Sequence, residues 1–420
     1  MGVRASSGVI PRTYRTLLAD RSARRLLVGL GVSSLGDGLS MVTIAWLAVR
    51  ISPAGEIGLF VGLALAAYTL PGAVGALALG SLFRRRPARA LVLGNCLLRT
   101  CFLGMAVALA ATGALSPVAY VALLAGSSLL ASWGSAGQYT MLAQVGGEDG
   151  RLAANSLATA QVWLATILGP AAAGLLLTRV APAWLLGFDA ATFAFLGVQA
   201  WRTHIDVPAA EQPVEARAAQ SGFRLLRRND LLGLIVLTWF FFFLYGPVED
   251  ALPVYVAHDL HAHAGLLGAY WTSFGVGALV STLFVGTLRG RATRSLTLLI
   301  VAGWGACLIP FAFAPPAAML ACFAVGGLIY GPFIPLTYAL FQSITTTANL
   351  PSVLAARSAV LTVASPLGTA IGGPIVAGLG AGLTLTASGA ATVLLAGLAT
   401  AVWRGANAGE PRLLRREVLV

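Results

Sequence analysis

The sequence predicts an all-α integral membrane protein, with about twelve transmembrane helices in two pseudo-symmetric six-helix bundles. Composition is the first reason: 58% of the 420 residues are hydrophobic and 10% are charged, whereas soluble domains carry roughly 25% charged residues. An internal repeat is the second. ILGPAAAG at 167–174 returns as IGGPIVAG at 371–378, LAANS at 152–156 returns as LAARS at 354–358, and the arginine spacing at 84–89 returns at 289–294. These three echoes in one order indicate a duplication of the whole chain, which is the layout of a secondary transporter.

The first bundle is predicted at residues 26–203, after a basic cytoplasmic arm at 1–25. A bilayer core is about 30 Å thick, so roughly 20 apolar residues are needed to cross it as a helix. Proline, glycine or charged residues mark the ends of such runs. Six runs of this kind are expected at 26–49, 57–83, 90–111, 118–143, 152–177 and 183–200.

The second bundle is predicted at residues 231–403, followed by a cytoplasmic tail at 404–420. Its six runs are expected at 231–256, 266–288, 296–314, 317–341, 353–379 and 383–403. Residues 204–230 form the longest polar stretch, and a stretch of this composition cannot bury itself. We therefore expect a cytoplasmic linker, whose end near 223–228 forms a short amphipathic helix on the inner leaflet.

The distribution of positive charge predicts the orientation. The net charge is +12, and every basic residue is an arginine in a short cluster between apolar runs. With the N-terminus in the cytosol, Arg50 and Arg179 are the only arginines expected outside, in agreement with the positive-inside rule. We therefore predict a multi-pass protein of the cell membrane with both termini cytoplasmic. The arginines do not form one patch with interleaved aromatic residues, so nucleic acid is not an expected partner.

Enzyme chemistry is poorly supported. A chain without lysine has no P-loop lysine and forms no Schiff base. The four cysteines lie inside apolar runs, and His258, His261 and His263 do not follow a zinc-ligand spacing. The sequence therefore predicts neither an enzyme nor a site for a metal or cofactor.

Several motifs carry a family resemblance. They are Ser34-Leu-Gly-Asp-Gly38 with Trp46, Leu70-Pro71, Leu98-Arg99, Asn155 before Ile167-Leu-Gly-Pro170 and Gly174, and Phe188-Asp-Ala-Ala-Thr-Phe193. With these motifs the chain resembles the major facilitator superfamily, and more narrowly its branch of macrolide-efflux and siderophore-export permeases. The resemblance implies the major facilitator fold, alternating access, and a central cavity lined by helices 1, 4, 7 and 10.

The loop between helices 2 and 3 departs from the family pattern. The superfamily usually has Gly-x-x-x-Asp-Arg-x-Gly-Arg-Arg here, whereas this chain has Arg84 in place of Asp and Pro87 in place of Gly. The cytoplasmic latch that the resemblance implies is therefore either missing or rebuilt with Glu148 or Asp149. The arginines of this loop and its repeat are either gate residues or plain topology anchors; they are Arg84, Arg85, Arg86, Arg89, Arg289, Arg291 and Arg294.

Charged residues inside the predicted helices are the candidates for proton coupling, because a charge at the bilayer centre costs at least ~2.5–3.5 kcal/mol. Asp37 and Arg99 fall at matching depths and are predicted to pair, either as a proton-exchanging pair or as a static one. Glu249 and Asp250 follow Gly246-Pro247, where a kink or break is expected. They either gate the outer mouth or reach external water. Asp189 is expected near the outer interface with a structural role.

Aromatic and amide side chains suggest a cavity for a bulky amphipathic solute, because rings offer stacking and loose apolar contact. Part of them could instead form interfacial belts or packing contacts. The candidates are Trp46, Trp133, Gln138, Tyr139, Trp163, Tyr245, Tyr338 and Gln342.

Small residues in helices 5 and 11 predict close helix packing. The motif comprises Gly169, Pro170 and Gly174 and their repeats Gly373, Pro374 and Gly378. We expect it to bring helix 5 against the second bundle and helix 11 against the first. The family resemblance gives the helix 5 motif a further meaning, an antiporter signature that favours export; packing without a transport direction is the alternative.

These observations together favour a monomeric secondary transporter that exports a hydrophobic or amphipathic small molecule, such as a drug, macrolide or secondary metabolite, in exchange for protons. Nutrient uptake by proton symport is the alternative within transport. A membrane receptor or scaffold that moves nothing is the alternative from another class.

Overall fold

The computed structural model describes residues 12–78, 86–203, 223–227, 229–284, 294–346 and 349–408. Within these residues the chain is helical and contains no β-strand. Twelve helical segments are long and apolar enough to cross a membrane. The predicted fold class is therefore confirmed.

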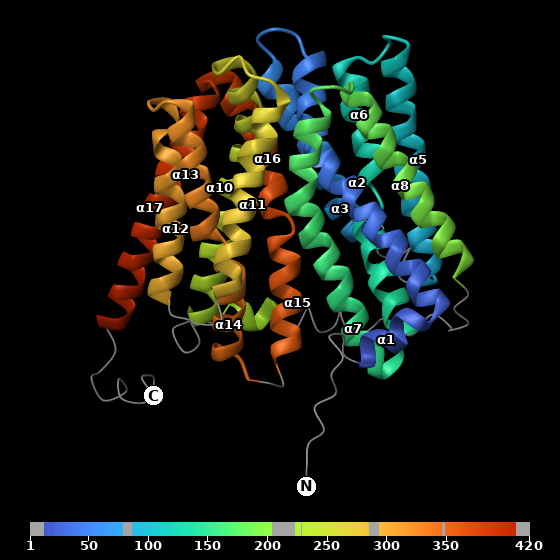
Figure 1. The fold of residues 1–420 in the computed structure, drawn as a ribbon. Coiled ribbons are helices and arrows are strands. Elements are labelled where there is room, and N and C mark those ends of the chain that lie inside the picture. Colours follow the sequence, from blue (N-terminus) through green and yellow to red (C-terminus); the bar gives the residue numbers. More distant parts are fainter. Residues whose placement is uncertain are drawn as a thin grey trace. The chain divides into compact units, whose positions relative to one another are not determined.

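The chain divides into two compact units (Figure 1). The first comprises residues 1–212 and 262–272, and the second comprises 213–261 and 273–420. Helix α11 (Ala264–Phe284) is divided between the two units, because its residues up to 272 group with the first. The domain bounds expected from the sequence stay a prediction.

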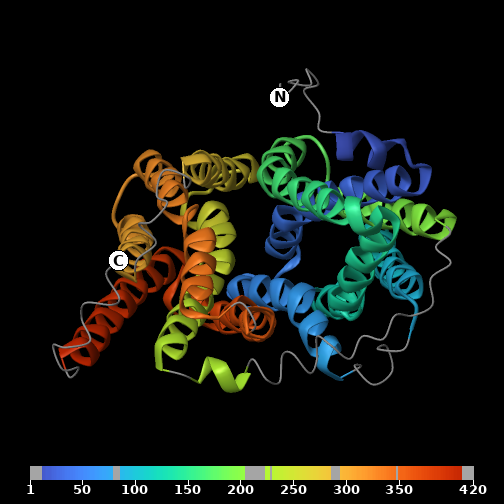
Figure 2. The same ribbon diagram turned by 90° about the horizontal axis from the view of Figure 1, so that it is seen from below.

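Among its described residues, the first unit contains seven helices besides that part of α11. They are α1 (Arg12–Ala19), α2 (Arg21–Ile51), α3 (Ile57–Ala78), α5 (Ala88–Ala111), α6 (Pro117–Ser128), α7 (Ala131–Leu176) and α8 (Pro182–Arg202). Helix α2 packs against α7 and α8, α5 packs against α6, α7 and α8, and α3 packs against α6 (Figures 1 and 2). Leu26, Leu30, Val92, Phe193 and Leu196 belong to its buried core.

The second unit is built on α10 (Asn229–Val254), which continues as a π-helix at Tyr255–Asp259. The remaining elements are α12 (Arg294–Leu308), a 3₁₀ turn at Ile309–Ala312, α13 (Pro316–Tyr330), α14 (Phe333–Ile344), α15 (Leu350–Leu361), α16 (Ala364–Leu379) and α17 (Ala381–Ala408). Helix α10 packs against α16 and α17, and α12 packs against α13 and α17.

Several elements differ from the predicted runs. The basic arm is partly helical, because α1 covers Arg12–Ala19 and α2 already begins at Arg21, where the Asp20 side chain accepts the Ala23 amide at 2.7 Å. The fourth and fifth candidate spans of the structure, Pro117–Val145 and Leu157–Leu176, share helix α7, whereas the sequence predicts separate runs at 118–143 and 152–177. Corresponding interruptions occur at 129–130 between α6 and α7 and at 331–332 between α13 and α14.

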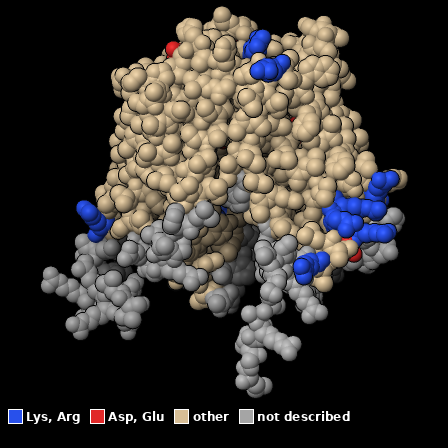
Figure 3. Space-filling model, viewed as in Figure 1, with Lys and Arg blue, Asp and Glu red and all other residues tan. Residues whose placement is uncertain are grey.

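The surface agrees with a bilayer as solvent. Large apolar side chains such as Leu175, Leu299 and Val402 are two-thirds or more exposed, which is stable only where lipid surrounds them. On the face drawn in Figure 3, the described arginines lie near helix ends and the middle of the face is largely uncharged.

Candidate functional site

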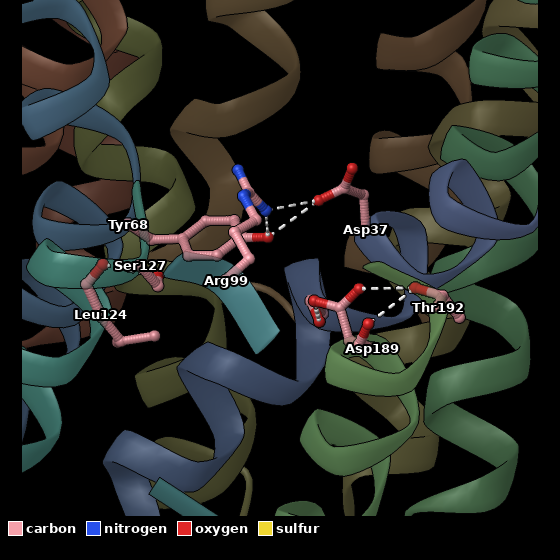
Figure 4. A network of polar contacts seen from close by, with 8 residues as sticks. Asp37, Tyr68, Arg99, Leu124, Ser127, Asp189 and Thr192 are labelled. Atoms are coloured by element: carbon pink, nitrogen blue, oxygen red, sulfur yellow. Dashed lines mark hydrogen bonds and ion pairs between the residues drawn. The ribbon is translucent and has the colours of Figure 1, made fainter. Parts of the chain in front are cut away.

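Three polar side chains from three helices meet in the first unit (Figure 4). Asp37 of α2 and Arg99 of α5 form an ion pair, with Arg99 Nη1 at 2.8 Å from Asp37 Oδ1. The Tyr68 hydroxyl of α3 donates to the same Asp37 oxygen at 2.9 Å and also contacts Arg99 Nη1. The predicted Asp37–Arg99 pair is therefore present, and Tyr68 is a third member that the sequence did not indicate. We name Asp37, Tyr68 and Arg99 the triad.

The two charges of the triad have different surroundings. The Arg99 side chain is 10% exposed, whereas the Asp37 side chain is 46% exposed. The guanidinium lies between two rings, 4.7 Å from the Tyr68 centroid and 4.6 Å from the Phe193 centroid, where cation–π attraction favours it. Arg99 is thus enclosed by its partners, whereas Asp37 is the accessible member of the triad.

A second carboxyl lies beneath the triad in Figure 4. Asp189 of α8 is completely buried, and its expected place near the outer interface stays a prediction. The Ser40 hydroxyl donates to Asp189 Oδ2 at 2.6 Å, and the Thr192 hydroxyl is 3.4 Å from Oδ1. A side chain at Gly36 would collide with Asp189 Oδ1 and Thr192 Oγ1. The glycine therefore creates the space in which α2 and α8 enclose this carboxyl.

Glu249 and Asp250 of α10 lie against α16. Ser365 and Thr369 of α16 donate to Glu249 Oε2, at 3.1 Å and 3.5 Å. Asp250 is completely buried, and neither carboxyl oxygen has a hydrogen-bond partner among the described residues. The Asp250 carboxyl therefore does not reach external water, which was one of the two alternatives given for Glu249 and Asp250.

Helix α10 continues without a break through Pro247 and Pro253. Of the kink or break expected at Pro247, the kink stays a prediction. A Cβ at Gly372 of α16 would collide with Asp250 Oδ2, so α16 makes room for the carboxyl with a glycine, as α2 does for Asp189.

The predicted cavity residues do not share one environment. Trp46 is buried, Gln138 is half-buried, Tyr139 and Gln342 are exposed, and the Trp163 side chain lies outside the described residues. Trp133 Nε1 donates to the Gly75 carbonyl at 2.9 Å, which gives this ring a packing contact. The Tyr338 ring centroid lies 4.0 Å from Arg357 Cζ. Arg357 is a buried cation that the sequence analysis did not select.

Tyr245 belongs to an aromatic cluster of the second unit. Its ring centroid is 5.9 Å from those of both Trp304 and Tyr330, and Phe274 lies 5.2 Å from Trp304. The sequence analysis selected Tyr245 alone from this cluster, because the other rings are far apart along the chain; Trp304 and Phe274 also lie in helices that were not expected to line the cavity, whereas Tyr330 lies in one that was. Only their common position on the helix faces brings them together.

The predicted cytoplasmic gate is only partly described. Arg84, Arg85, Arg289 and Arg291, with the acids Glu148 and Asp149, lie outside the residues whose side chains are described. Arg86 is exposed, and Arg89 Nη2 donates to the Trp201 carbonyl at 2.5 Å. The Arg294 guanidinium lies 5.4 Å from the Trp403 ring centroid. A latching role for these residues stays a prediction.

The glycine–proline motif packs differently in its two copies. Gly169 lies against Gly38 of α2. A Cβ at Gly174 would be 2.7 Å from Gly268 Cα of α11, a helix that the sequence analysis assigned to the second bundle, although this part of it groups with the first unit. A Cβ at Gly378 would meet nothing within 4 Å. Pro170 and Pro374 lie inside continuous helices, and Gly373 is buried. In the second unit, Gly368 instead approaches Gly246 of α10.

Among the described residues, no three His, Cys, Asp or Glu side chains gather in a way that could hold a metal ion. The triad and the enclosed acids Asp189 and Asp250 place ionisable groups within helical spans. Such groups in a membrane protein typically belong to a transport pathway.

Comparisons with known proteins agree with this arrangement. The family model described as "Transmembrane secretion effector" matches residues 18–401. The enterobactin exporter EntS of Shigella flexneri is 26% identical over 251 residues, which are 59% of this chain and 58% of that protein. EntS of Escherichia coli O139:H28 is 26% identical over 250 residues, or 59% of each chain. The chain thus matches less than two thirds of the length of these relatives.

Two solved structures have the same fold. The nucleoside transporter NupG superposes with a TM-score of 0.71 and 13% identity, covering 92% of this chain and all of that one. The D-xylose–proton symporter superposes with a TM-score of 0.66 and 15% identity, covering 90% of this chain and 96% of that one. The chain belongs to the transmembrane secretion effector family of the major facilitator superfamily.

Proposed function

We propose that this transporter exports a hydrophobic or amphipathic small molecule in exchange for protons, working as a monomer with both termini in the cytoplasm. The observation that carries the proposal is the triad. It places a half-exposed carboxylate beside an enclosed arginine inside a membrane-spanning helix. When Asp37 gains a proton, it loses its negative charge and its ion pair with Arg99 weakens. Proton binding can in this way change how α2 and α5 hold each other.

The direction of transport and the solute class rest on other observations. The curated relatives are exporters of enterobactin, and the aromatic cluster around Tyr245 offers ring faces to a bulky solute. The rings lie close to Glu249, one helical turn further along α10. An apolar solute with a polar or cationic group suits this combination better than a small sugar does, because a sugar needs many directed hydrogen bonds.

Transport into proteoliposomes tests the proposal. The protein is oriented with its cytoplasmic face outward, and the vesicle lumen is made acidic. We then expect an inward flux of a labelled macrolide or catecholate siderophore as protons leave the lumen. Asp37→Asn should reduce gradient-driven flux at least tenfold while leaving downhill exchange of the solute measurable. Glu56→Gln, which alters an exposed acid in a loop, is the control.

Each alternative gives a different result in this assay. Normal gradient-driven flux in Asp37→Asn, together with a lowered melting temperature, would make the triad a static ion pair. Accumulation only in the direction of proton entry would indicate uptake by symport. No flux of any solute under a gradient would favour a receptor or scaffold.

A further inference from the structure

A surface groove lies between α12 and α17 of the second unit and encloses about 500 Å³. Helix α12 begins at Arg294, and Arg404 lies in the last turns of α17. Both arginines line the groove, so the two helices run antiparallel along it and bring both cations to one end. None of the lining residues is acidic.

Away from the arginines the groove is lined mostly by apolar residues, with Ser295 and Thr400 as the polar exceptions. From Arg294 the lining continues along α12 through Leu298, and from Arg404 it continues along α17 through Gly397 to Val393. At 1.5 Å per residue, the distance along the helix from Arg404 to Gly397 is about 10 Å. A ligand that fills this groove therefore has an anionic end and a long apolar part.

Trp403 marks where the charged end lies relative to a bilayer. Its ring lines the groove, and the Arg294 guanidinium stacks over it at 5.4 Å from the centroid. Tryptophan and arginine gather at membrane–water interfaces, where the ring is half in hydrocarbon and the cation reaches the headgroups. Beside the groove, Leu299, Leu394 and Leu398 are more than half exposed, as expected of a surface that faces lipid.

We propose that this groove is a binding site for an anionic glycerophospholipid, with its phosphate on Arg294 and Arg404 and one acyl chain along Leu298, Gly397 and Val393. Charge complementarity selects an anionic over a zwitterionic lipid, since each arginine near the membrane surface contributes about 1 kcal/mol toward an anionic headgroup. The apolar length selects a lipid over a soluble phosphate. The bound lipid bridges the start of α12 to the end of α17, and so ties two helices of the second unit at one leaflet.

A glycine in the groove permits a clean test. A Cβ at Gly397 would meet no atom within 4 Å, so Gly397→Phe fills the acyl part of the groove without a collision inside the protein. Gly104 of α5 is also helical and equally open, and Gly104→Phe is the matched control. Arg294→Gln and Arg404→Gln remove the charges, and Arg202→Gln controls for the loss of an exposed arginine at another helix end.

The measurement is native mass spectrometry of the full-length protein, purified in detergent and titrated with palmitoyl-oleoyl phosphatidylglycerol. We expect one tightly retained lipid that palmitoyl-oleoyl phosphatidylcholine does not replace. Each arginine substitution should weaken retention about fivefold, and Gly397→Phe should abolish it, while both controls retain it. Melting curves check that each variant is folded.

Three outcomes would overturn the proposal. They are unchanged retention in Gly397→Phe, equal retention of phosphatidylcholine, and displacement of the lipid by soluble glycerol phosphate. Should either arginine variant fail to fold, Gly397→Phe decides alone, because a Cβ at Gly397 meets no atom within 4 Å. The result is independent of the transport assay, since no residue of the groove belongs to the triad.

Discussion

At the residue scale, Arg99 is the side chain on which the triad depends. It is a nearly enclosed cation with a carboxylate, a phenol hydroxyl and two ring faces around it. A buried charge is tolerated only when it is paired and hydrogen-bonded. Tyr68 contacts Arg99 through its hydroxyl and through its ring face. One substitution can separate the polar contact from the ring contact.

Tyr68→Phe removes the hydroxyl and leaves the ring over the guanidinium. We expect the free energy of unfolding to fall by about 1–2 kcal/mol, because hydrogen bonds to charged groups are lost from a buried site. Thermal melting in detergent measures the change. Tyr139→Phe, at a ring that is 46% exposed, should change the melting temperature little; an equal drop in both variants would contradict the role given to the Tyr68 hydroxyl.

Gly36→Ala tests how tightly α2 and α8 enclose Asp189. The added methyl would collide with Asp189 Oδ1 and Thr192 Oγ1, so we expect a loss of about 1–3 kcal/mol from overpacking. Gly104→Ala, in open space, should be neutral or stabilising because alanine favours the helix. A melting temperature of Gly36→Ala at or above that of the wild type would contradict the geometry of this site.

At the element scale, glycines set the distance between crossing helices in both units. Gly38 and Gly169 bring α2 against α7, and Gly246 and Gly368 bring α10 against α16. A larger side chain at such a point separates the two helices, because backbone atoms cannot yield as a flexible side chain can. The helix 5 motif thus packs closely at Gly169 against α2 and at Gly174 against α11. The packing of helix 11 against the first bundle stays a prediction.

The two copies of the repeat make an element-scale prediction. Gly174→Ala should lower the melting temperature markedly, because its Cβ would be 2.7 Å from Gly268 Cα. Gly378→Ala, at the equivalent repeat position, should be neutral or slightly stabilising, because its Cβ meets nothing within 4 Å. Melting of the two purified variants side by side checks this, and equal destabilisation would show that both copies pack alike.

At the scale of the whole molecule, charge determines orientation. Arginines flank the apolar spans in clusters, with Arg50 and Arg179 as the two expected outside. A positively charged loop resists crossing the membrane during insertion. The orientation of the termini is thus a prediction from the full set of loops.

Reporter fusions test this orientation. A green fluorescent protein fused after residue 420 should fluoresce, since it folds in the cytoplasm. Alkaline phosphatase fused after Gly55, in the loop between α2 and α3, should be active on the outside, and phosphatase fused within the linker at 204–222 should be inactive. An active phosphatase at the linker would reverse the assigned orientation.

The sequence alone supports the prediction of the membrane class, the twelve spans and the repeat, because an apolar run of bilayer length can satisfy its backbone polar groups only as a helix. It also predicts the Asp37–Arg99 pair, because opposite charges at equal depth in an apolar medium are stabilised by forming an ion pair. It does not predict Tyr68, the burial of Asp189 and Asp250, or the ring cluster around Tyr245. Those depend on which helix faces meet, and the apolar spans carry little periodic signal for that.

The order and length of the helices and their membrane setting follow from local chemistry, because each apolar span forms a helix across the bilayer by itself. The duplication can be read directly from the sequence. Tertiary structure alone decided which glycines bring helices together, which carboxyls are enclosed, and where two arginines meet at one end of a groove. The physical reason is that lipid is as apolar as the helices themselves, so hydrophobicity does not select helix partners. Shape and the few polar groups make that selection.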